Sequence, residues 1–546
     1  MTDHFIGVDV GTGSVRVGVF GQFGQPLATS KHDIAMHTEP GGIAEQSSTQ
    51  VWNAVCAATR SAVANAAIDP GTVRGIGFDA TCSMVVLCAN GKSLPVGDLA
   101  HPKRDIIVWM DHRAVEQAAR INAGEHHVLM YVGGRISPEM QTPKLLWLKE
   151  NRPETYAAAG SFFDLTDFLG WKATGSLSRS SCTVTCKWTY LAHERRWDPD
   201  YFHAIGLGDL VEDNFARIGQ EIVRPGTKLG QGLTKAAASE LGLSPGTAVA
   251  AGLIDAHAGG IATVGARGGA EDPTSCLGYV FGTSSCTMTT TAEPTFVPGV
   301  WGPYYSAMIP GAWLCEGGQS AAGAAIDQLV SLHPACSEAA AFAKAEGKPL
   351  PVWLADTALA HAATASDVVA LATGLHVVPE FLGNRAPFSD PMARAVIAGL
   401  GMENDIRSLQ ALYVAGICSL GYGLRQIVEI KNRNGAPVSS IAVSGGAGQH
   451  PLVRQLLADA TGLRVEATRC DEPVLLGSAI LGAVAAGSFA DINAAMPMMS
   501  EIGQSYTPAA GTLRQVHDDR FDAFLKLQTV ARDIRNTGDH QPQSRV

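Results

Sequence analysis

The hydrophobic positions at the start of the chain form two short runs that predict a β-hairpin. Phe5–Val10 and Val15–Phe20 are rich in β-branched and aromatic residues, and Gly11–Ser14 separates them. Runs of this length bounded by glycine and small polar residues are typical of strands. A second polar turn follows at 21–25. We therefore expect the chain to open with two antiparallel strands joined by a tight glycine turn.

Beyond the hairpin, the pattern changes to an alternation of helices and strands. Residues 51–67 are alanine-rich with apolar positions at helical spacing, and 73–78 and 84–88 are short apolar runs that indicate strands. Helical and strand-like runs alternate thereafter. A hairpin followed by this alternation predicts an α/β fold in which helices cover a mixed sheet.

The opening turn recurs in the second half of the chain. Tyr279–Ser285 has the same x-Gly-Thr-x-Ser core as Val10–Ser14, and the strand-like run 286–291 follows it. The polar, glycine-rich stretch 265–273 before it is a candidate linker. Two similar lobes that face each other across a cleft are the simplest interpretation. A chance likeness of one five-residue turn is the alternative.

The length of the chain, 546 residues, is too great for one hydrophobic core. We expect an N-terminal domain at 1–267, a C-terminal domain at 276–490 and a helical tail at 491–546. The tail is predicted to contain a last helix near 516–535 and to end in polar residues, 536–546, without a catalytic role.

Composition narrows the class of protein. With 46% hydrophobic and 17% charged residues the chain can bury cores, and its net charge of −11 disfavours nucleic-acid partners. Eleven cysteines without C-x-x-C pairs indicate buried thiols in a reducing cytoplasm. The start lacks a basic leader, and apolar runs such as 479–486 are shorter than the ~20 residues that cross a bilayer. We expect a soluble cytoplasmic protein with no membrane partner, and a homodimer as the default assembly.

The two glycine turns are candidate phosphate sites. In Gly11–Ser14 and Gly282–Ser284 several backbone N–H groups can converge without obstruction by side chains. Asp9 precedes the first turn and suits hydrated Mg²⁺, whereas the second turn has Val280 at the equivalent position. An ordinary hairpin turn is the alternative for each. A P-loop is disfavoured, because Asn90–Ser93 lacks the earlier glycine of that motif.

Two further segments carry candidate chemistry. Asp255 ends an apolar run and is followed by small residues that open a helix, so it could accept a proton from a sugar hydroxyl or only cap that helix. His257 is predicted to be a neighbouring polar contact rather than the base. Ser444–Gln449 is a glycine-rich turn between a strand and a helix, which favours an anionic or planar ligand but also occurs in plain strand–helix turns.

These motifs, in this order, resemble those of the FGGY carbohydrate kinases over about residues 5–490. The resemblance implies a two-lobed, actin/hexokinase-like ATPase fold with duplicated ribonuclease H-like domains, and ATP and Mg²⁺ as co-substrate and cofactor. It implies that the N-terminal domain, 1–267, binds the sugar and carries the first phosphate motif, and that the C-terminal domain, 276–490, binds the nucleotide. It also implies that Asp255 is the catalytic base and that Asp9 and Asp255 lie at the metal. The residues that it places at ATP are Gly11, Thr12, Gly13, Ser14, Gly282, Thr283, Ser284, Gly445, Gly446, Ala447 and Gln449.

The resemblance also extends to segments that hold the sugar. Asp79–Val85 looks like the Thr-Cys-Ser-Leu-Val type motif of the branch that acts on D-ribulose, with Met84 in place of leucine. Trp109–Arg113 resembles the W-x-D-x-R segment of the family. The substrate contacts implied are Asp79, Thr81, Cys82, Asp111, Lys187, Asp255 and Glu316. Structural alternatives exist: an Asp79 that caps a turn, a surface Lys187, and an Asp111–Arg113 ion pair.

The activity expected from this resemblance is phosphorylation of a free ketopentose, D-ribulose first. Another sugar kinase of the family, acting on L-ribulose, D-xylulose or a polyol, is the first alternative, because pocket hydrogen bonds decide between such sugars. An actin-like ATPase without sugar kinase activity is a second, against which the segments at Asp79, Asp111 and Lys187 argue. A sugar-binding pseudoenzyme is a third, and Asp9 and Asp255 argue against it.

Overall fold

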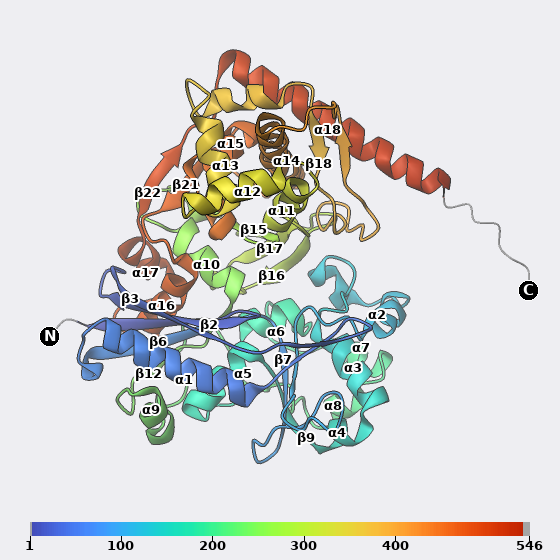
Figure 1. Ribbon diagram of the computed structural model, residues 1–546. Helices are drawn as coiled ribbons and strands as arrows, with labels where there is room; N and C mark the ends of the chain where they lie inside the picture. Colours follow the sequence, from blue (N-terminus) through green and yellow to red (C-terminus); the bar gives the residue numbers. More distant parts are fainter. Residues whose placement is uncertain (1–2, 539–546) are drawn as a thin grey trace, which may run out of the picture.

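The computed structural model describes residues 3–538 as two lobes, each built on a mixed sheet (Figure 1). The first sheet has the order β12-β6-β1-β2-β3, and β13 also pairs with β6. Its strands are β1 (His4–Val10), β2 (Ser14–Gly21), β3 (Pro26–Asp33), β6 (Val73–Ala80), β12 (Ala248–Val249) and β13 (Leu253–Ile254). The predicted opening hairpin is confirmed, since β1 and β2 pair antiparallel from His4↔Gly21 to Val10↔Val15.

The second sheet repeats this arrangement and extends it, with the order β16-β17-β15-β14-β20-β21-β22. Both sheets begin with an antiparallel hairpin, and the first strand of each then pairs in parallel with a later one: β1 with β6, and β14 with β20. The strands are β14 (Cys276–Phe281), β15 (Ser285–Thr291), β16 (Trp301–Tyr305), β17 (Trp313–Gln319), β20 (Ser440–Ser444), β21 (Arg464–Thr468) and β22 (Ile502–Tyr506). The recurring glycine turn therefore reflects a repeated lobe.

A smaller sheet in the first lobe carries β7, in the order β4-β5-β8-β7-β9. Its strands are β4 (His37–Glu39), β5 (Ile43–Gln46), β7 (Met84–Cys88), β8 (Ile106–Ile107) and β9 (Ala159–Asp164). β7 has the predicted bounds. Minor pairs join β10 (Arg179–Ser180) to β11 (Ile222–Val223) and β18 (His376–Val378) to β19 (Val396–Ala398).

Helices cover the sheets of both lobes. Those of the first half of the chain are α1 (Ser48–Asn65), α2 (Val115–Asn122), α3 (Gln141–Asn151), α4 (Pro153–Ala158), α5 (Leu165–Thr174), α6 (Ser181–Lys187), α7 (Pro199–Ala204), α8 (Gly208–Glu212), α9 (Lys235–Leu241) and α10 (Asp255–Val264). Those of the second half are α11 (Gly323–Ser331), α12 (Cys336–Ala345), α13 (Leu350–Leu359), α14 (Ile406–Arg433), α15 (Pro451–Thr461), α16 (Pro473–Ala485), α17 (Ile492–Met499) and α18 (Gly511–Gly538).

The first sheet is buried on both faces. The alternate positions Ile6 and Val8 pack with α1 residues such as Val55 in one hydrophobic cluster. On the other face, α16 returns from the second half of the chain and lies across β1 and β6 (Figure 1). A Cβ on Gly77 would lie 1.9 Å from the Ser478 carbonyl oxygen, so glycine permits this close approach. The two halves of the chain are therefore packed together through one sheet.

The C-terminal segment differs in part from the helices expected there. It includes α17 and α18, but also β22, which pairs antiparallel with β21 and so extends the second sheet. α18 begins earlier than the predicted 516 and continues through 536–538, and the rest of the polar end, 539–546, lies outside the described residues. Figure 1 shows α18 along the outer side of the second lobe.

Among the described residues, α14 is the one helix with the length and hydropathy to cross a membrane. The sequence pattern predicted no apolar segment long enough to cross a bilayer and did not identify this helix. Of its most apolar window, 83% is buried inside the protein. Burial of this extent is typical of the central helix of a folded core, and α14 packs against α15, α11 and α18 in the second lobe.

Candidate functional site

Three carboxylates lie together at one edge of the first sheet. Asp9 lies in β1 opposite Asp79 in β6, and Asp255 follows β13, whose Leu253 pairs with Asp79. These strands are parallel, so their carboxyl ends meet at the same edge of the sheet. The sequence folds this way locally because each strand is a short apolar run that ends in small or polar residues. The topology thus gathers acids that are far apart in the sequence.

The carboxyl groups of the cluster repel one another. Burial and the charge of Asp9 raise the pKa of Asp255 to about 6, and the same two causes raise the pKa of Asp79 well above its usual range. Arg16 donates to Asp9 Oδ2 from Nε at 3.0 Å. Asp79 Oδ2 accepts from the Ser478 hydroxyl at 2.5 Å, whereas its buried Oδ1 has no hydrogen-bond partner. Such a set of oxygen donors fits a hard divalent cation.

Each predicted phosphate turn is closed by a backbone hydrogen bond from its first glycine, although the second turn is one residue shorter. The Gly11 N–H donates to the Ser14 carbonyl at 3.0 Å, and the Gly282 N–H donates to the Ser284 carbonyl at 3.0 Å. Residues of both turns line one cavity of about 380 Å³ between the lobes. The cavity wall also includes Asp9 and Asp255. The turns therefore face the carboxylate cluster across a shared space, which suits a phosphate chain held by backbone N–H groups.

The glycine-rich turn after β20 reaches the same cavity through Gly445. Gly445 has a φ of 91°, and a Cβ there would lie 2.5 Å from the Phe281 carbonyl oxygen, so the position requires glycine. The structure does not bring Gly13, Gly446, Ala447 or Gln449 into the cavity wall. Gly446 and Gln449 are exposed beside it, in and after the short 3₁₀ helix Gly446–Gly448.

A second group of polar residues lines the other part of the cavity. Thr81 and Cys82 follow β6, Lys187 ends α6, and Glu316 lies in β17 of the second lobe. Burial disfavours the charge on Glu316, but Lys187 and His257 outweigh it and lower its pKa to about 2. Despite burial, the thiol of Cys82 and the charge of Glu316 raise the pKa of Lys187 well above its usual range. Lys187 and Glu316 are thus both charged and can form charge-assisted hydrogen bonds with hydroxyl groups in the cavity.

Asp111 has a different environment from the other predicted sugar contacts. It does not line the cavity, and its buried carboxylate accepts from Arg113 at 2.8 Å and from the Ala44 N–H at 2.7 Å. Asp79 likewise lies behind the cavity wall, bonded to Ser478. The ion pair that sequence analysis kept as the alternative for Asp111 is present. Its contribution is to hold the loop that carries Trp109, which does line the cavity.

Sequence reasoning missed several residues of the cavity wall, among them Glu139, Trp301 and Arg385. The Trp301 ring has the Lys187 ammonium 5.2 Å and the Arg385 guanidinium 5.4 Å from its centroid. Arg385 comes from the loop between β18 and β19. No motif in the sequence marks these positions, because they reach the cavity from loops or strand ends that only the packing of the two lobes brings there.

His257 lies behind the sugar side of the cavity, fully buried on α10. Its Nε2 is 3.4 Å from Glu316 Oε2, and its Nδ1 is 3.1 Å from Cys182 Sγ. Burial disfavours its positive charge, but Cys182 and Glu316 raise its pKa, and His257 and Cys186 in turn lower the pKa of Cys182 against the effect of burial. The predicted role of His257 as a polar neighbour of the site agrees with these contacts.

Comparison with known protein families identifies the family of this chain. Residues 4–262 match the N-terminal domain of the FGGY family of carbohydrate kinases, and 277–486 match its C-terminal domain. The chain belongs to the FGGY family. It is therefore a carbohydrate kinase, and a small-molecule sugar is its substrate class.

Individual FGGY proteins resemble the chain over nearly its whole length. It is 45% identical over 532 residues to the human FGGY carbohydrate kinase domain-containing protein, with 96% of each chain covered. It is 36% identical over 569 residues to a D-ribulokinase of Saccharomyces cerevisiae, covering 98% of this chain and 78% of that one. The FGGY fold assigned from sequence, two-lobed and actin/hexokinase-like, is confirmed. A xyloylose kinase from Brucella ovis superposes with a TM-score of 0.80 at 19% identity, over 97% and 100% of the two chains.

Proposed function

We propose that this FGGY kinase transfers the γ-phosphoryl group of ATP to D-ribulose and forms D-ribulose 5-phosphate and ADP. The observation that carries the proposal is the single cavity in which two phosphate turns and Asp255 meet Thr81, Cys82, Lys187 and Glu316. The similarity to a D-ribulokinase over 98% of the chain supports the choice of sugar. We also propose that the enzyme acts in the cytoplasm and assembles as a homodimer.

Asp255 is proposed to be the catalytic base. It lies at the first position of α10, and its Oδ1 accepts from the Ala256 N–H at 2.7 Å, which orients the carboxylate. In the proposed step, the sugar 5-hydroxyl attacks the γ-phosphorus, its proton passes to the Asp255 carboxylate, and the bond to the ADP oxygen breaks. With a pKa of about 6, Asp255 is ionised at neutral pH and is matched to this task.

The nucleotide is proposed to bind along the turns of both lobes. Gly11–Ser14 and Gly282–Ser284 would bind the phosphates, and the Gly445 turn would back the adenosine. Asp9 and Asp255 would hold Mg²⁺, since the carboxyl groups of their cluster, which repel one another, fit a hard cation. Bound Mg²⁺ would offset the phosphate charge during transfer.

The sugar is proposed to lie between the Asp255 carboxylate and the Lys187–Glu316 pair. These charged groups, one donor and one acceptor, would form charge-assisted hydrogen bonds with sugar hydroxyls. Trp301, which lines the same cavity, offers an apolar face to the carbon chain. Thr81 and Cys82 would form the wall of the sugar pocket that lies next to the first sheet. We assign Asp79 and Asp111 to positioning roles behind this pocket, because neither lines it.

The test is ADP release by the purified protein with ATP and Mg²⁺ against D-ribulose, L-ribulose, D-xylulose, L-xylulose, glycerol and erythritol, with a control without sugar. We expect the highest kcat/KM with D-ribulose. Preference for another sugar would keep the kinase mechanism and reject the choice of substrate. Turnover that does not depend on sugar would contradict the proposal and favour an ATPase.

A further inference from the structure

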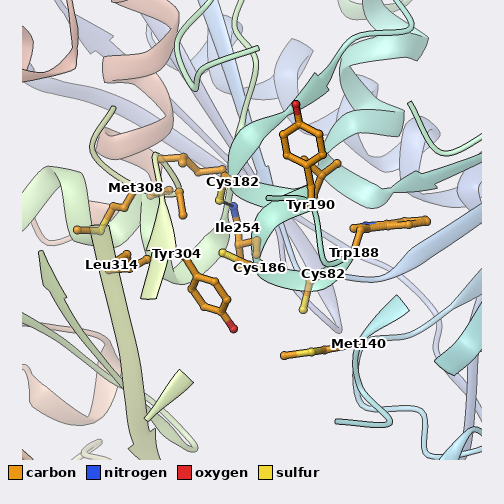
Figure 2. Packing of buried hydrophobic residues seen from close by; sticks show 14 of the residues in the cluster. Cys82, Met140, Cys182, Cys186, Trp188, Tyr190, Ile254, Tyr304, Met308 and Leu314 are labelled. Atoms are coloured by element: carbon orange, nitrogen blue, oxygen red, sulfur yellow. Dashed lines mark hydrogen bonds between the residues drawn. The ribbon is translucent and has the colours of Figure 1, made fainter. Parts of the chain in front are cut away.

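Two cysteines and a histidine form a compact buried cluster that the kinase mechanism does not use. Cys182 and Cys186 lie one helical turn apart on α6, and His257 faces them from α10. The ligand atoms of all three lie within 4.8 Å of one another, and all three side chains are fully buried. Figure 2 shows Cys182 and Cys186 close to Ile254 at the centre of this region. We propose that Cys182, Cys186 and His257 bind one soft divalent metal ion such as Zn²⁺.

The donor set supports a soft ion. Thiolate sulfur and imidazole nitrogen are the preferred ligands of Zn²⁺, at about 2.3 and 2.0 Å, whereas Mg²⁺ prefers oxygen. Tetrahedral angles then place ligand atoms roughly 3.5 to 3.8 Å apart. Cys182 Sγ and His257 Nδ1 are already 3.1 Å apart. The three ligand atoms all lie within 4.8 Å of one another, which is near the separations that a single ion requires.

The surroundings of His257 supply an independent argument. Its Nδ1 points to Cys182, and its Nε2 lies 3.4 Å from the Glu316 carboxylate. Metal-binding histidines almost always donate their second ring N–H to a carboxylate, carbonyl or water, and this bond sets the tautomer that leaves the other nitrogen free for the metal. Glu316 therefore has the position of an outer carboxylate of a carboxylate–histidine–zinc arrangement.

The occupied cluster would carry no net charge. Two thiolates balance the charge of the dication, and His257 binds as the neutral imidazole. Binding releases the protons that these ligands carry. The ion can therefore be buried without an unpaired charge.

The site is independent of the proposed choice of sugar, but it borders the cavity. Lys187 follows Cys186 directly, and Glu316 is shared between His257 and the cavity wall. Metal binding would therefore hold two groups of the sugar side in place. The site is distinct from the Asp9–Asp255 cluster, which offers only oxygen ligands.

The experiment is a titration of the chelator-treated full chain with Co²⁺, followed by displacement with Zn²⁺. We expect thiolate-to-cobalt charge-transfer absorption and the visible bands of tetrahedral Co²⁺, with about one ion per chain. Co²⁺ bound at the carboxylates would lack the thiolate absorption. Absence of that absorption in the wild-type protein overturns the proposal without any variant.

Variants then assign the ligands. Cys182→Ser, Cys186→Ser and the double variant should lose the thiolate absorption and the bound zinc, as measured by metal analysis after gel filtration. Cys418→Ser, at an equally buried cysteine on α14, should retain both. Glu316→Gln should weaken zinc binding about 10-fold, as loss of an outer carboxylate does. Equal zinc content in the double variant and in Cys418→Ser would overturn the assignment.

Discussion

At the scale of single residues, Asp255 and Glu316 are both carboxylates of the cavity wall, but their surroundings give them different pKa values. Asp255 lines the cavity and has a pKa raised to about 6 by burial and Asp9, so it can take up a proton. Glu316 is more deeply buried, but Lys187 and His257 lower its pKa to about 2. Environment rather than residue type therefore makes one acid a candidate base and the other a permanent hydrogen-bond acceptor.

Replacing the proposed base tests its role directly. Asp255→Asn is expected to lower kcat roughly 100- to 10,000-fold, because the amide cannot accept the proton of the sugar hydroxyl. The affinity for ADP without Mg²⁺, measured by calorimetry, should be nearly unchanged, since the turns that bind phosphate remain intact. Asp33→Asn, at a side chain that is 81% exposed, serves as the control and should keep full activity. Comparable turnover in the two variants would reject Asp255 as the base.

Removal of the buried ammonium tests the sugar side. Lys187→Ala is expected to raise the KM for the sugar about 10-fold or more, because a charge-assisted hydrogen bond is worth roughly 1.5 to 3 kcal/mol. The KM for ATP should change little. Initial rates over a range of sugar concentrations measure both, with the exposed Lys31→Ala as the control. An unchanged sugar KM would assign Lys187 a structural role only.

At the scale of elements, two helices of the second half of the chain position parts of the site through contacts behind the cavity wall. α16 lies across β1 and β6 and brings the Ser478 hydroxyl to Asp79. α18 brings Gln528 to Glu380, whose carboxylate also accepts from Asn384. The first contact supports the carboxylate cluster, and the second supports the loop that carries Arg385 to the cavity.

The contact between α16 and the first sheet depends on glycine. Gly77→Ala would place a Cβ against the Ser478 carbonyl oxygen, at 1.9 Å if nothing moved. We expect the free energy of unfolding to fall by about 1 to 3 kcal/mol, the usual cost of overpacking. Urea unfolding measures it. Gly446→Ala, where a Cβ would have no neighbour within 4 Å, should leave stability unchanged, and equal stability of the two variants would contradict the argument.

The link from α18 to the Arg385 loop predicts an effect on sugar binding from outside the cavity. Gln528→Ala removes the donor to Glu380 at 2.6 Å and the acceptor of Gln426. We expect the sugar KM to rise about fivefold, which corresponds to one hydrogen bond of roughly 1 kcal/mol. Gln515→Ala, on the same helix at an exposed position, is the matched control. Equal KM values for both variants would show that α18 does not position the loop.

At the scale of the whole molecule, the site is divided between two lobes. The first lobe contributes the three carboxylates and Lys187, and the second contributes Glu316 and two of the three glycine turns. Neither lobe alone holds both substrates. Closure of the lobes would therefore exclude water from the transferred phosphoryl group and bring the two substrates together.

Closure should be visible in solution. We expect the radius of gyration from small-angle X-ray scattering to decrease when D-ribulose and ADP with Mg²⁺ are both bound, because ligands that contact both lobes favour the closed arrangement. Sucrose with ADP and Mg²⁺ is the control for sugar in the buffer. An identical radius with and without both ligands would argue for a rigid molecule.

The sequence by itself determined the features that depend on local residue type. A tight turn or a strand end requires particular residues at adjacent positions. The sequence could therefore predict the opening hairpin, the two glycine turns and the small residues around Asp255. The family, the two-lobed fold and the kinase activity follow from the order of these motifs. Their recognition needs no knowledge of which residues touch.

Only the tertiary structure decided which residues share the cavity. Arg385 and Glu139 reach it from segments without a motif, whereas Asp111 turns away into an ion pair. The contact between Cys182 and His257 could not be predicted from the sequence either, because these residues lie on separate helices. Contacts of this kind depend on how strands and helices pack over long sequence separations, and no local pattern encodes that packing.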